Sequence, residues 1–238
     1  MRNAKMLIVI VLAALAPACG PLEWLNPCYQ EQDLVFDPAL VGTWKEDDSS
    51  SVIEFRAVGG KSYRMLVVDR SASNSEPELT RFDAHLVKLG DTLFLDVLPE
   101  VAEATPGSYE LALPPLDDLP SPPPHLTKLG DGLYASLVPP PQSSGADRPG
   151  DGFEIRVIQA HWVFKIHLDG TGLRLSDLDE DWFKEATSEG KVRVGFERID
   201  DTYVLTGSTE ELRQLLLENG DDDHAFPKDS GEALRRQK

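Results

Sequence analysis

Apolar and polar residues alternate along most of the chain between residues 40 and 207. In residues 79–89, every second position from Phe82 to Leu86 is apolar and the positions between them are polar. A period of two residues is typical of a β-strand with one buried face. The pattern predicts strands over 40–46, 51–57, 61–68, 79–89, 92–98, 161–168, 173–176, 191–198 and 202–207.

Short turns join many of these strands. Gly90-Asp91 separates 79–89 from 92–98, and Asp169-Gly170 follows 161–168. Strands with one polar face and tight connections indicate an antiparallel sheet, which must bury its apolar side. We therefore expect a mostly β fold, an antiparallel barrel or a strongly curved sheet.

A repeat supports this expectation. Sixteen residues starting at His85 recur forty residues later, starting at His125, with eight identities. The shared glycine, aspartate and leucines are residues that a tight hairpin needs. We predict superimposable β-hairpins over 85–98 and 125–138, with the histidines on the polar face.

Two segments predict helices. Residues 179–189 begin with acidic residues, which suit a helix N-terminus. Ser208 and Glu211 have the spacing of a capping box, and the leucines of 212–216 share one face before Gly220. We expect this C-terminal amphipathic helix to follow the last strand and to pack on the outside or end of the sheet.

The N-terminus has the pattern of a secretory signal peptide over residues 1–18. Two basic residues precede eleven apolar residues, from Met6 to Ala16, and small residues lead to Cys19. Eleven helical residues rise only about 16 Å, roughly half of a bilayer's hydrocarbon core. We therefore expect export and no transmembrane helix.

The residues Leu15-Ala16-Pro17-Ala18-Cys19-Gly20 resemble the lipobox of bacterial lipoproteins. The resemblance implies that Cys19 is lipidated and becomes the first mature residue. It places the protein in the bacterial cell envelope, anchored in the outer membrane and facing the periplasm. Ala16 departs from the larger aliphatic residue usual there. The alternative is cleavage after Ala18 and a disulfide between Cys19 and Cys28, the only two cysteines.

Composition divides the rest of the chain. Residues 19–34 predict a tether, and 35–220 the β-barrel domain. Within that domain, 99–150 form an insert that holds twelve of the eighteen prolines and should be surface loop. Residues 221–238 predict a disordered acidic tail, because they offer little to bury.

The net charge limits the partners. The formal charge of −18 becomes −20 once Arg2 and Lys5 leave with the signal peptide, because 21 basic and 41 acidic residues remain. Such a surface repels nucleic acid and anionic head groups. We expect no nucleic-acid partner, and membrane attachment through the lipid anchor alone.

The start of the first predicted strand resembles the lipocalin signature, carried here by Phe36-Asp37 and Gly42-Thr43-Trp44. The resemblance implies an eight-stranded barrel closed at one end by Trp44. Lipocalins place an arginine on that tryptophan just after the last barrel strand, but residues 204–211 contain none. The nearest candidates are Arg193 and Arg198.

The lipocalin resemblance implies binding of an apolar small molecule or lipid inside the barrel. In a small barrel, however, inward side chains can simply fill the interior. The alternative is an interaction module of the cell envelope that uses the acidic surface or the Pro-rich insert. The inward candidates for ligand binding are Ile53, Phe55, Phe82, Leu93, Trp162 and Phe164.

Motifs for catalysis are missing from the sequence. It has no Gly-x-Ser-x-Gly, His-Glu-x-x-His or phosphate-binding glycine loop. Residues from Asp177 begin like a calcium loop, but Trp182 stands where the turn needs glycine. We expect a non-catalytic protein without cofactor or metal. The whole chain also resembles a group of uncharacterised bacterial envelope lipoproteins, which implies nothing about mechanism.

Overall fold

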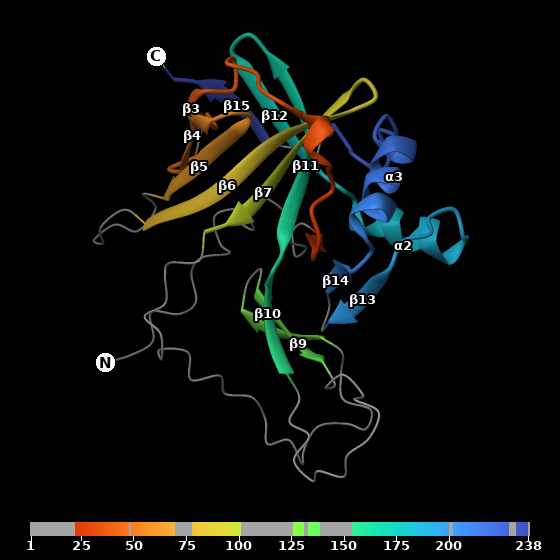
Figure 1. Ribbon diagram of the computed structural model, residues 1–238. Helices are drawn as coiled ribbons and strands as arrows, with labels where there is room; N and C mark the ends of the chain where they lie inside the picture. The colour runs from red at the N-terminus through yellow and green to blue at the C-terminus, as the bar shows by residue number, and fades with distance from the viewer. Residues whose placement is uncertain are drawn as a thin grey trace, which may run out of the picture.

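The computed structural model describes residues 22–47, 49–69, 78–100, 126–130, 133–138, 154–199, 202–228 and 232–237. Strands predominate among them, with two α-helices beside the sheet (Figure 1). No helix in these ranges is both long enough and apolar enough to cross a bilayer. The elements are β1 (Glu23–Trp24), η1 (Glu31–Asp33), β2 (Leu34–Val35), β3 (Gly42–Lys45), β4 (Val52–Gly59), β5 (Ser62–Asp69), β6 (Glu78–Leu89), β7 (Thr92–Pro99), β8 (Leu126–Gly130), β9 (Leu133–Val138), β10 (Glu154–Gln159), β11 (His161–Asp169), β12 (Gly172–Asp177), α2 (Glu180–Ser188), β13 (Phe196–Ile199), β14 (Thr202–Leu205), α3 (Thr209–Asn219) and β15 (Glu232–Arg236).

Eight of these strands close into an antiparallel barrel. The order is β3-β4-β5-β6-β7-β11-β12-β15, and β15 pairs back onto β3. Neighbours in the barrel follow one another in chain order, with β8–β10 inserted after β7, and β13, β14 and the helices after β12. The expected mostly β fold with an antiparallel barrel is confirmed.

The alternation along each strand selects the barrel interior. On β6, Phe82, Ala84 and Leu86 are buried inside, whereas Arg81 and Asp83 are exposed. Successive side chains of a strand point to opposite faces, so a strict period of two gives one apolar inner face. The buried barrel core comprises Leu40, Trp44, Ile53, Phe55, Tyr63, Met65, Val67, Phe82, Ala84, Leu86, Leu95, Val97, Trp162, Phe164, Ile166, Leu173, Leu175 and Leu234.

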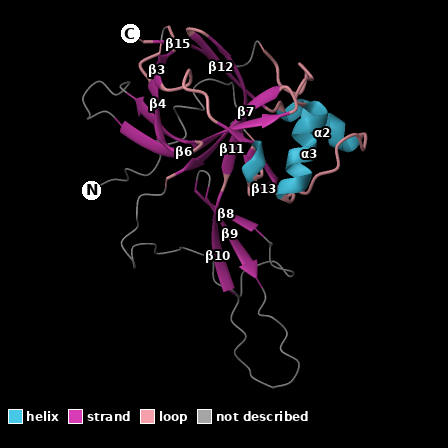
Figure 2. Ribbon diagram, turned by 45° about the horizontal axis from the view of Figure 1, so that its top comes forward, coloured by secondary structure: helices cyan, strands magenta, loops and turns pink. Residues whose placement is uncertain are grey.

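A second layer covers the outer face of β6, β7 and β11. Outward-pointing Val87, Phe94 and Val163 share one cluster with Leu212 and Leu216 of α3. Both helices lie on the same side of the barrel (Figure 2). The expectation that α3 packs on the outside of the sheet is therefore confirmed.

The predicted cap of α3 is present. Glu211 Oε2 accepts a hydrogen bond from the Ser208 backbone N–H at 2.7 Å, and Ser208 Oγ accepts one from the Glu211 N–H at 3.4 Å. The pair satisfies N–H groups that the first helical turn leaves without partners. Gly220 ends the helix as predicted. A Cβ at this position would lie 2.8 Å from the Phe94 ring. Glycine therefore also allows the C-terminal end of α3 to approach Phe94 of β7 closely.

The segment predicted to be a tether, residues 19–34, is part of the fold from residue 22 onward. Leu22, Trp24 and Cys28 are buried in the second layer. The strand β1 pairs with both β11 and β14. The predicted tether was wrong from residue 22 onward. It rested on the average composition of the segment, but a few apolar residues are enough to hold a short segment against a sheet.

The tail predicted to be disordered, residues 221–238, also belongs to the fold in its described part. Ala225 and Phe226 are fully buried, and Phe226 packs edge-on against Phe94 with ring centroids 5.6 Å apart. Residues 232–236 form β15, so α3 precedes the last barrel strand and does not follow it. The prediction of disorder was wrong for the described part of the tail. It rested on the acidic residues, whereas the apolar residues Ala225, Phe226 and Leu234 are buried in the fold.

An ion pair fixes residue 33 to α3. The Asp33 carboxylate accepts hydrogen bonds from Arg213 Nε at 2.7 Å and from Arg213 Nη2 at 3.0 Å. Only 7% of Asp33 is exposed. The hydrogen bond from Arg213 holds the pKa of Asp33 below its usual 3.8, although burial acts in the opposite direction.

This pair predicts an acid-sensitive contribution to stability. Because the folded-state pKa of Asp33 is depressed, the contribution is present above about pH 4 and is lost as pH falls through the folded pKa. We expect the urea midpoint to fall more steeply below pH 4 in the parent chain than in Arg213→Gln. Lys191→Gln, which breaks an exposed pair with Glu189, is the control. Parallel pH profiles for parent and Arg213→Gln would contradict this prediction.

The two repeat segments both form hairpins, β6–β7 and β8–β9. They are not superimposable at the turn. Leu89 pairs with Thr92 in the first copy, whereas Gly130 pairs with Leu133 in the second, after an irregularity between Lys128 and Gly130. The strand pairing of the second copy is therefore displaced by one residue relative to the first. His125 lies outside the described residues.

The second hairpin belongs to a separate three-stranded sheet, β10-β9-β8. Strand β10 leads through Ala160 directly into β11. The small sheet is therefore connected to the barrel through the chain that forms β10 and β11. Figures 1 and 2 show it projecting from the barrel, on the side away from the β11–β12 turn. Part of the Pro-rich insert thus forms strands.

Candidate functional site

One end of the barrel, which we call the Trp44 end, is closed by side chains. Trp44 is fully buried and donates a hydrogen bond from Nε1 to the Leu40 carbonyl at 2.9 Å. The Arg236 guanidinium lies over its ring, 4.7 Å from the centroid. Arg236 also donates to the carbonyls of Val41, at 3.0 Å, and Ala39. These contacts combine cation–π attraction with satisfied backbone acceptors.

The expected arginine is therefore Arg236, and the candidates Arg193 and Arg198 were wrong. Arg198 instead lies over the Tyr203 ring, 5.9 Å from its centroid. The structure also shows why a glycine, Gly42, lies two residues before Trp44. Its φ is +141°, and a Cβ there would lie 3.1 Å from Arg236 Nη1. Glycine at this position leaves room for the guanidinium.

The six predicted ligand-binding residues lie together in the barrel core. Five are buried, and Leu93 is partly buried against them. The rings of Phe82 and Trp162 are 5.5 Å apart between centroids. Asp96, the buried acid of β7, points outward between inward-facing Leu95 and Val97. The interior formed by the described residues is therefore apolar.

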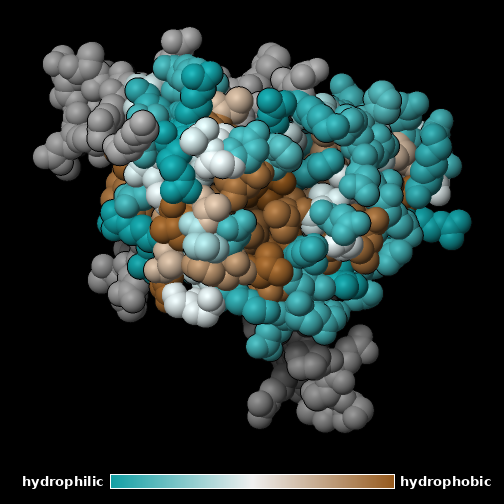
Figure 3. Space-filling model, turned by 90° about the horizontal axis from the view of Figure 1, so that it is seen from above, coloured by the Kyte–Doolittle hydropathy of each residue, from teal (hydrophilic) through white to brown (hydrophobic). Residues whose placement is uncertain are grey.

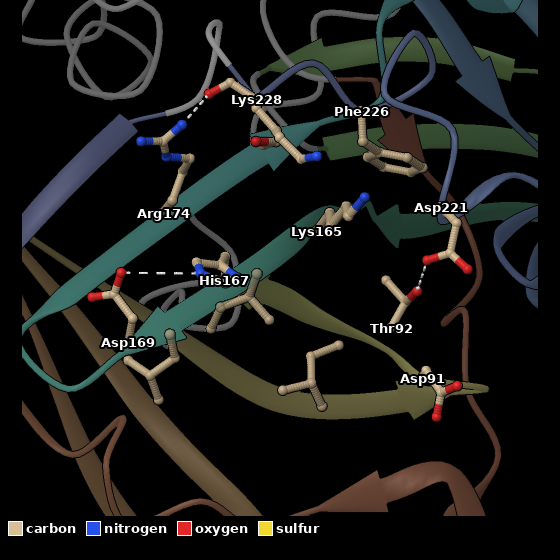
Figure 4. Close-up of a pocket in the computed structure, with 13 residues that line it drawn as sticks. Asp91, Thr92, Lys165, His167, Asp169, Arg174, Asp221, Phe226 and Lys228 are labelled. Carbon is tan, nitrogen blue, oxygen red and sulfur yellow. Dashed lines mark hydrogen bonds and ion pairs between the residues drawn. The ribbon is translucent and has the colours of Figure 1, made fainter.

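The barrel wall has an opening beside the Trp44 end. Strands β7 and β11 pair only from Val97–Trp162 to Phe94–Lys165. Beyond that point, Thr92 pairs only with β6, and β11 continues only with β12. A pocket of about 500 Å³ lies in this wall opening (Figure 4). Its lining residues are Asp91, Thr92, Leu93, Lys165, Ile166, His167, Leu168, Asp169, Arg174, Ser176, Asp221, Phe226 and Lys228.

The wall opening was not predicted from the sequence. Alternation does place Lys165 and His167 on the polar face of β11. Their partners across the pocket come from the 221–228 segment, which the prediction treated as disordered. No local signal shows where two strands of a barrel separate, because this depends on strand register and barrel closure.

Apolar side chains gather around the same end of the barrel. Figure 3 views the molecule from above and shows apolar residues at its centre with hydrophilic residues around them. Of the barrel-core residues that remain partly exposed, Val41, Leu93 and Leu168 lie beside strand ends at the Trp44 end. Phe36, 41% exposed, stacks on Tyr63 close by.

A buried polar cluster lies between the barrel and the second layer. Asp96 Oδ1 is 2.6 Å from His161 Nδ1, and Asp96 Oδ2 accepts a hydrogen bond from the Cys28 N–H at 3.3 Å. His85 lies within 3.2 Å of the hydroxyls of Tyr29 and Ser62. Burial lowers the pKa of His85. His85 is thus half-buried beneath Tyr29 and is not part of the exposed polar row that alternation predicted.

Cys28 is chemically protected in this cluster. It is fully buried, and burial, together with the neighbouring Asp96 carboxylate, raises the pKa of its thiol well above the usual value. Because the thiolate is the reactive form, such a thiol should be inert. Cys28 therefore has the properties of a structural residue in a buried polar cluster and not those of a nucleophile.

We expect Cys28, in a Cys19→Ser chain, to resist iodoacetamide at about pH 8 and to react fully in concentrated guanidinium chloride. Labelling is measured by intact-protein mass spectrometry. The control adds Ser188→Cys, an exposed position at the end of α2, which should label readily in the folded chain. Equal native labelling rates for Cys28 and this control would contradict the prediction.

Metal ligands do not gather in the part of the chain that the structure describes, since no three His, Cys, Asp or Glu side chains there could hold one ion. No family model, curated protein or solved structure matches the chain.

Proposed function

We propose that the protein is exported, lipid-anchored through Cys19 and non-catalytic, and that its barrel binds an apolar small molecule or lipid. The observation that carries the proposal is the closed eight-stranded barrel with an apolar interior. Barrels of this size either fill with side chains or hold one small ligand. The Arg236–Trp44 stack supports the lipocalin resemblance, because it supplies the arginine that residues 204–211 lack.

An unpaired Cys28 is compatible with the anchor. Its thiol lies fully buried against Asp96, and burial raises its pKa, so that a free thiol here is unreactive. A buried free cysteine behaves as a small apolar residue and needs no partner. Lipidated Cys19 would attach the acidic protein to a membrane that its surface charge would otherwise repel.

The anchor is tested by Cys19→Ser. The variant should lose its acyl chains, measured by mass spectrometry, and move from the membrane fraction to the soluble fraction. A variant that remains bound to membranes would exclude attachment through Cys19.

The ligand is tested by native extraction and by a variant that fills the interior. The soluble Cys19→Ser chain should carry an apolar ligand that mass spectrometry detects after extraction. Ala84 is fully buried inside the barrel, and Ala84→Phe should displace that ligand. If the barrel is already filled, the same variant should instead destabilise the fold by about 1–3 kcal/mol through overpacking. A stable variant and a ligand-free parent would refute the carrier function.

A second candidate is an interaction module of the cell envelope. The projecting sheet β10-β9-β8 favours it, because this sheet stands apart from the barrel (Figure 2). A chain lacking residues 100–153 should keep the barrel and any ligand but lose an envelope partner in cross-linking. If cross-linked products were unchanged, the sheet would not be the docking element.

A further inference from the structure

The wall opening joins an apolar inner side to a charged rim. Ile166 belongs to the buried barrel core, and the partly buried Leu93 and Leu168 pack against that core; all three line the pocket. Phe226 is fully buried and lines it from the 221–228 segment. A ligand in the opening can therefore contact the partly exposed side chains of Leu93 and Leu168 at the edge of the barrel core. Its volume of about 500 Å³ suits a small molecule.

Basic side chains gather on the β11–β12 side of the rim. Lys165 and His167 point outward from β11, and Arg174 lies opposite His167 on β12. Lys228 approaches from the C-terminal segment (Figure 4). The lining contains three Lys or Arg residues and three carboxylates, so its formal charge is zero, in a chain of net charge −18.

The carboxylates of the rim are largely engaged by the protein itself. Asp221 accepts a hydrogen bond from Thr92 at 2.7 Å, and Asp169 accepts one from the Gly172 N–H at 3.1 Å. Among the cations, Lys228 Nζ is already paired with Asp223 Oδ2 at 2.7 Å. The Lys165 side chain makes no ion pair or hydrogen bond with a described residue, although its charge adds to the Lys228 hydrogen bond in lowering the pKa of Asp223. Arg174 donates only to the Lys228 carbonyl, at 2.7 Å.

We propose that the wall opening binds a single amphiphile, with an anionic head group held by Lys165 and Arg174 and an apolar chain directed into the barrel past Leu93 and Leu168. This inference rests on the proposed function, because it names the class of ligand and its point of entry. A phosphate or carboxylate head would accept charge-assisted hydrogen bonds from both cations. The chain would remove apolar surface of the opening from water.

A monomeric ligand fits better than a bilayer surface. The mature chain carries a formal charge of −20, and anionic lipid surfaces would repel it at long range. A single head group meets only the local field of the rim. The pocket is also recessed between strands, whereas a bilayer would need an exposed basic face.

The test uses the Cys19→Ser chain, which has no acyl chains of its own to occupy the opening. Dodecyl phosphate and laurate are titrated calorimetrically, below their micelle concentrations, beside dodecan-1-ol and inorganic phosphate. The variant is Lys165→Gln with Arg174→Gln. The control is Lys61→Gln, which removes an exposed lysine at the β4–β5 turn. Melting temperatures confirm that each variant folds.

We expect the paired glutamine variant to bind dodecyl phosphate and laurate about tenfold more weakly or worse, because two charge-assisted contacts are lost. Lys61→Gln should stay within about twofold of the parent, and dodecan-1-ol should bind all three chains alike. Inorganic phosphate should bind weakly throughout, because it has no chain to bury.

Four results would overturn the inference. Unchanged dodecyl phosphate binding in the paired variant would move the head group elsewhere and leave the proposed function standing. Absence of binding by every alkyl probe would contradict both this inference and the proposed carrier function. Phosphate binding as tight as dodecyl phosphate binding would indicate an anion site without a lipid role. Binding only to phosphatidylglycerol vesicles, and not to monomeric amphiphiles, would indicate a membrane surface.

Discussion

Deleting residues 232–238 is expected to abolish cooperative unfolding of the barrel. This segment supplies β15, which joins β12 to β3, and removing it exposes two unpaired strand edges. It also removes Leu234, which is buried in the barrel core, and Arg236. Loss of a buried leucine alone costs on the order of 2–5 kcal/mol, a large part of a domain's total stability of about 5–15 kcal/mol.

The measurement is urea denaturation of the Cys19→Ser chain, followed by tryptophan fluorescence and circular dichroism. Leu234→Ala gives a graded comparison and should lower the free energy of unfolding by about 2–4 kcal/mol. Arg235→Gln is the matched control in the same strand. Its side chain is 73% exposed and pairs with Asp47 at 3.1 Å, so its loss should cost less than about 1 kcal/mol. A truncated chain with the parental midpoint would show that β15 does not close the barrel in solution.

Replacing Trp44 with alanine is expected to lower the free energy of unfolding by about 3–5 kcal/mol. The indole is fully buried at the Trp44 end, and alanine would leave a cavity that surrounding strands can fill only in part. The Arg236 guanidinium would lose its stacking partner, and the Leu40 carbonyl would lose its donor.

A double-mutant cycle with Arg236→Leu isolates the stack. Arg236→Leu alone should lower the free energy of unfolding by about 1–3 kcal/mol, because the carbonyls of Val41 and Ala39 lose their donor. If stacking contributes, the two changes should fall short of additivity by about 1 kcal/mol. Trp182→Ala, at a partly exposed position of α2, is the control for removing a tryptophan. Strict additivity would mean that Trp44 and Arg236 act independently.

Local patterns predicted most of the strands and both helices correctly. Alternation around Phe82 and around Phe164 assigned the inner face, because a one-residue shift would move every apolar side chain outward. The capping box of Ser208 and Glu211 set the start of α3, because that signal lies within four consecutive residues. Such features depend on neighbours in the chain and survive without tertiary context.

The hairpin of 191–207 shows where local patterns stop. Its strands form as β13 and β14, but they lie outside the barrel, where β14 pairs in parallel with β1. Alternation predicts that a strand forms and says nothing about its partner. The barrel takes β15 instead, and among 233–236, the part of β15 whose burial the structure describes, Leu234 is the one buried core residue. A five-residue strand with one such residue has no recognisable pattern.

The candidate site divides in the same way. The six inward residues from Ile53 to Phe164 were predictable, because each lies within an alternating strand. The wall opening was not, because Lys165 and Lys228 are 63 residues apart in sequence and meet only through closure by the C-terminal segment. Arg236 was missed for the same reason, since its contact with Trp44 spans nearly the whole domain.

By itself, the sequence determined that this chain forms a mostly β, antiparallel structure with two flanking helices, and which face of each long strand is apolar. Those properties follow from short-range periodicity and from capping. Only the tertiary structure decided which strand closes the barrel, which arginine covers Trp44, and where β7 and β11 separate to form the wall opening. Strand closure and register are set by the combined burial of residues distant in sequence, and no single segment carries that information.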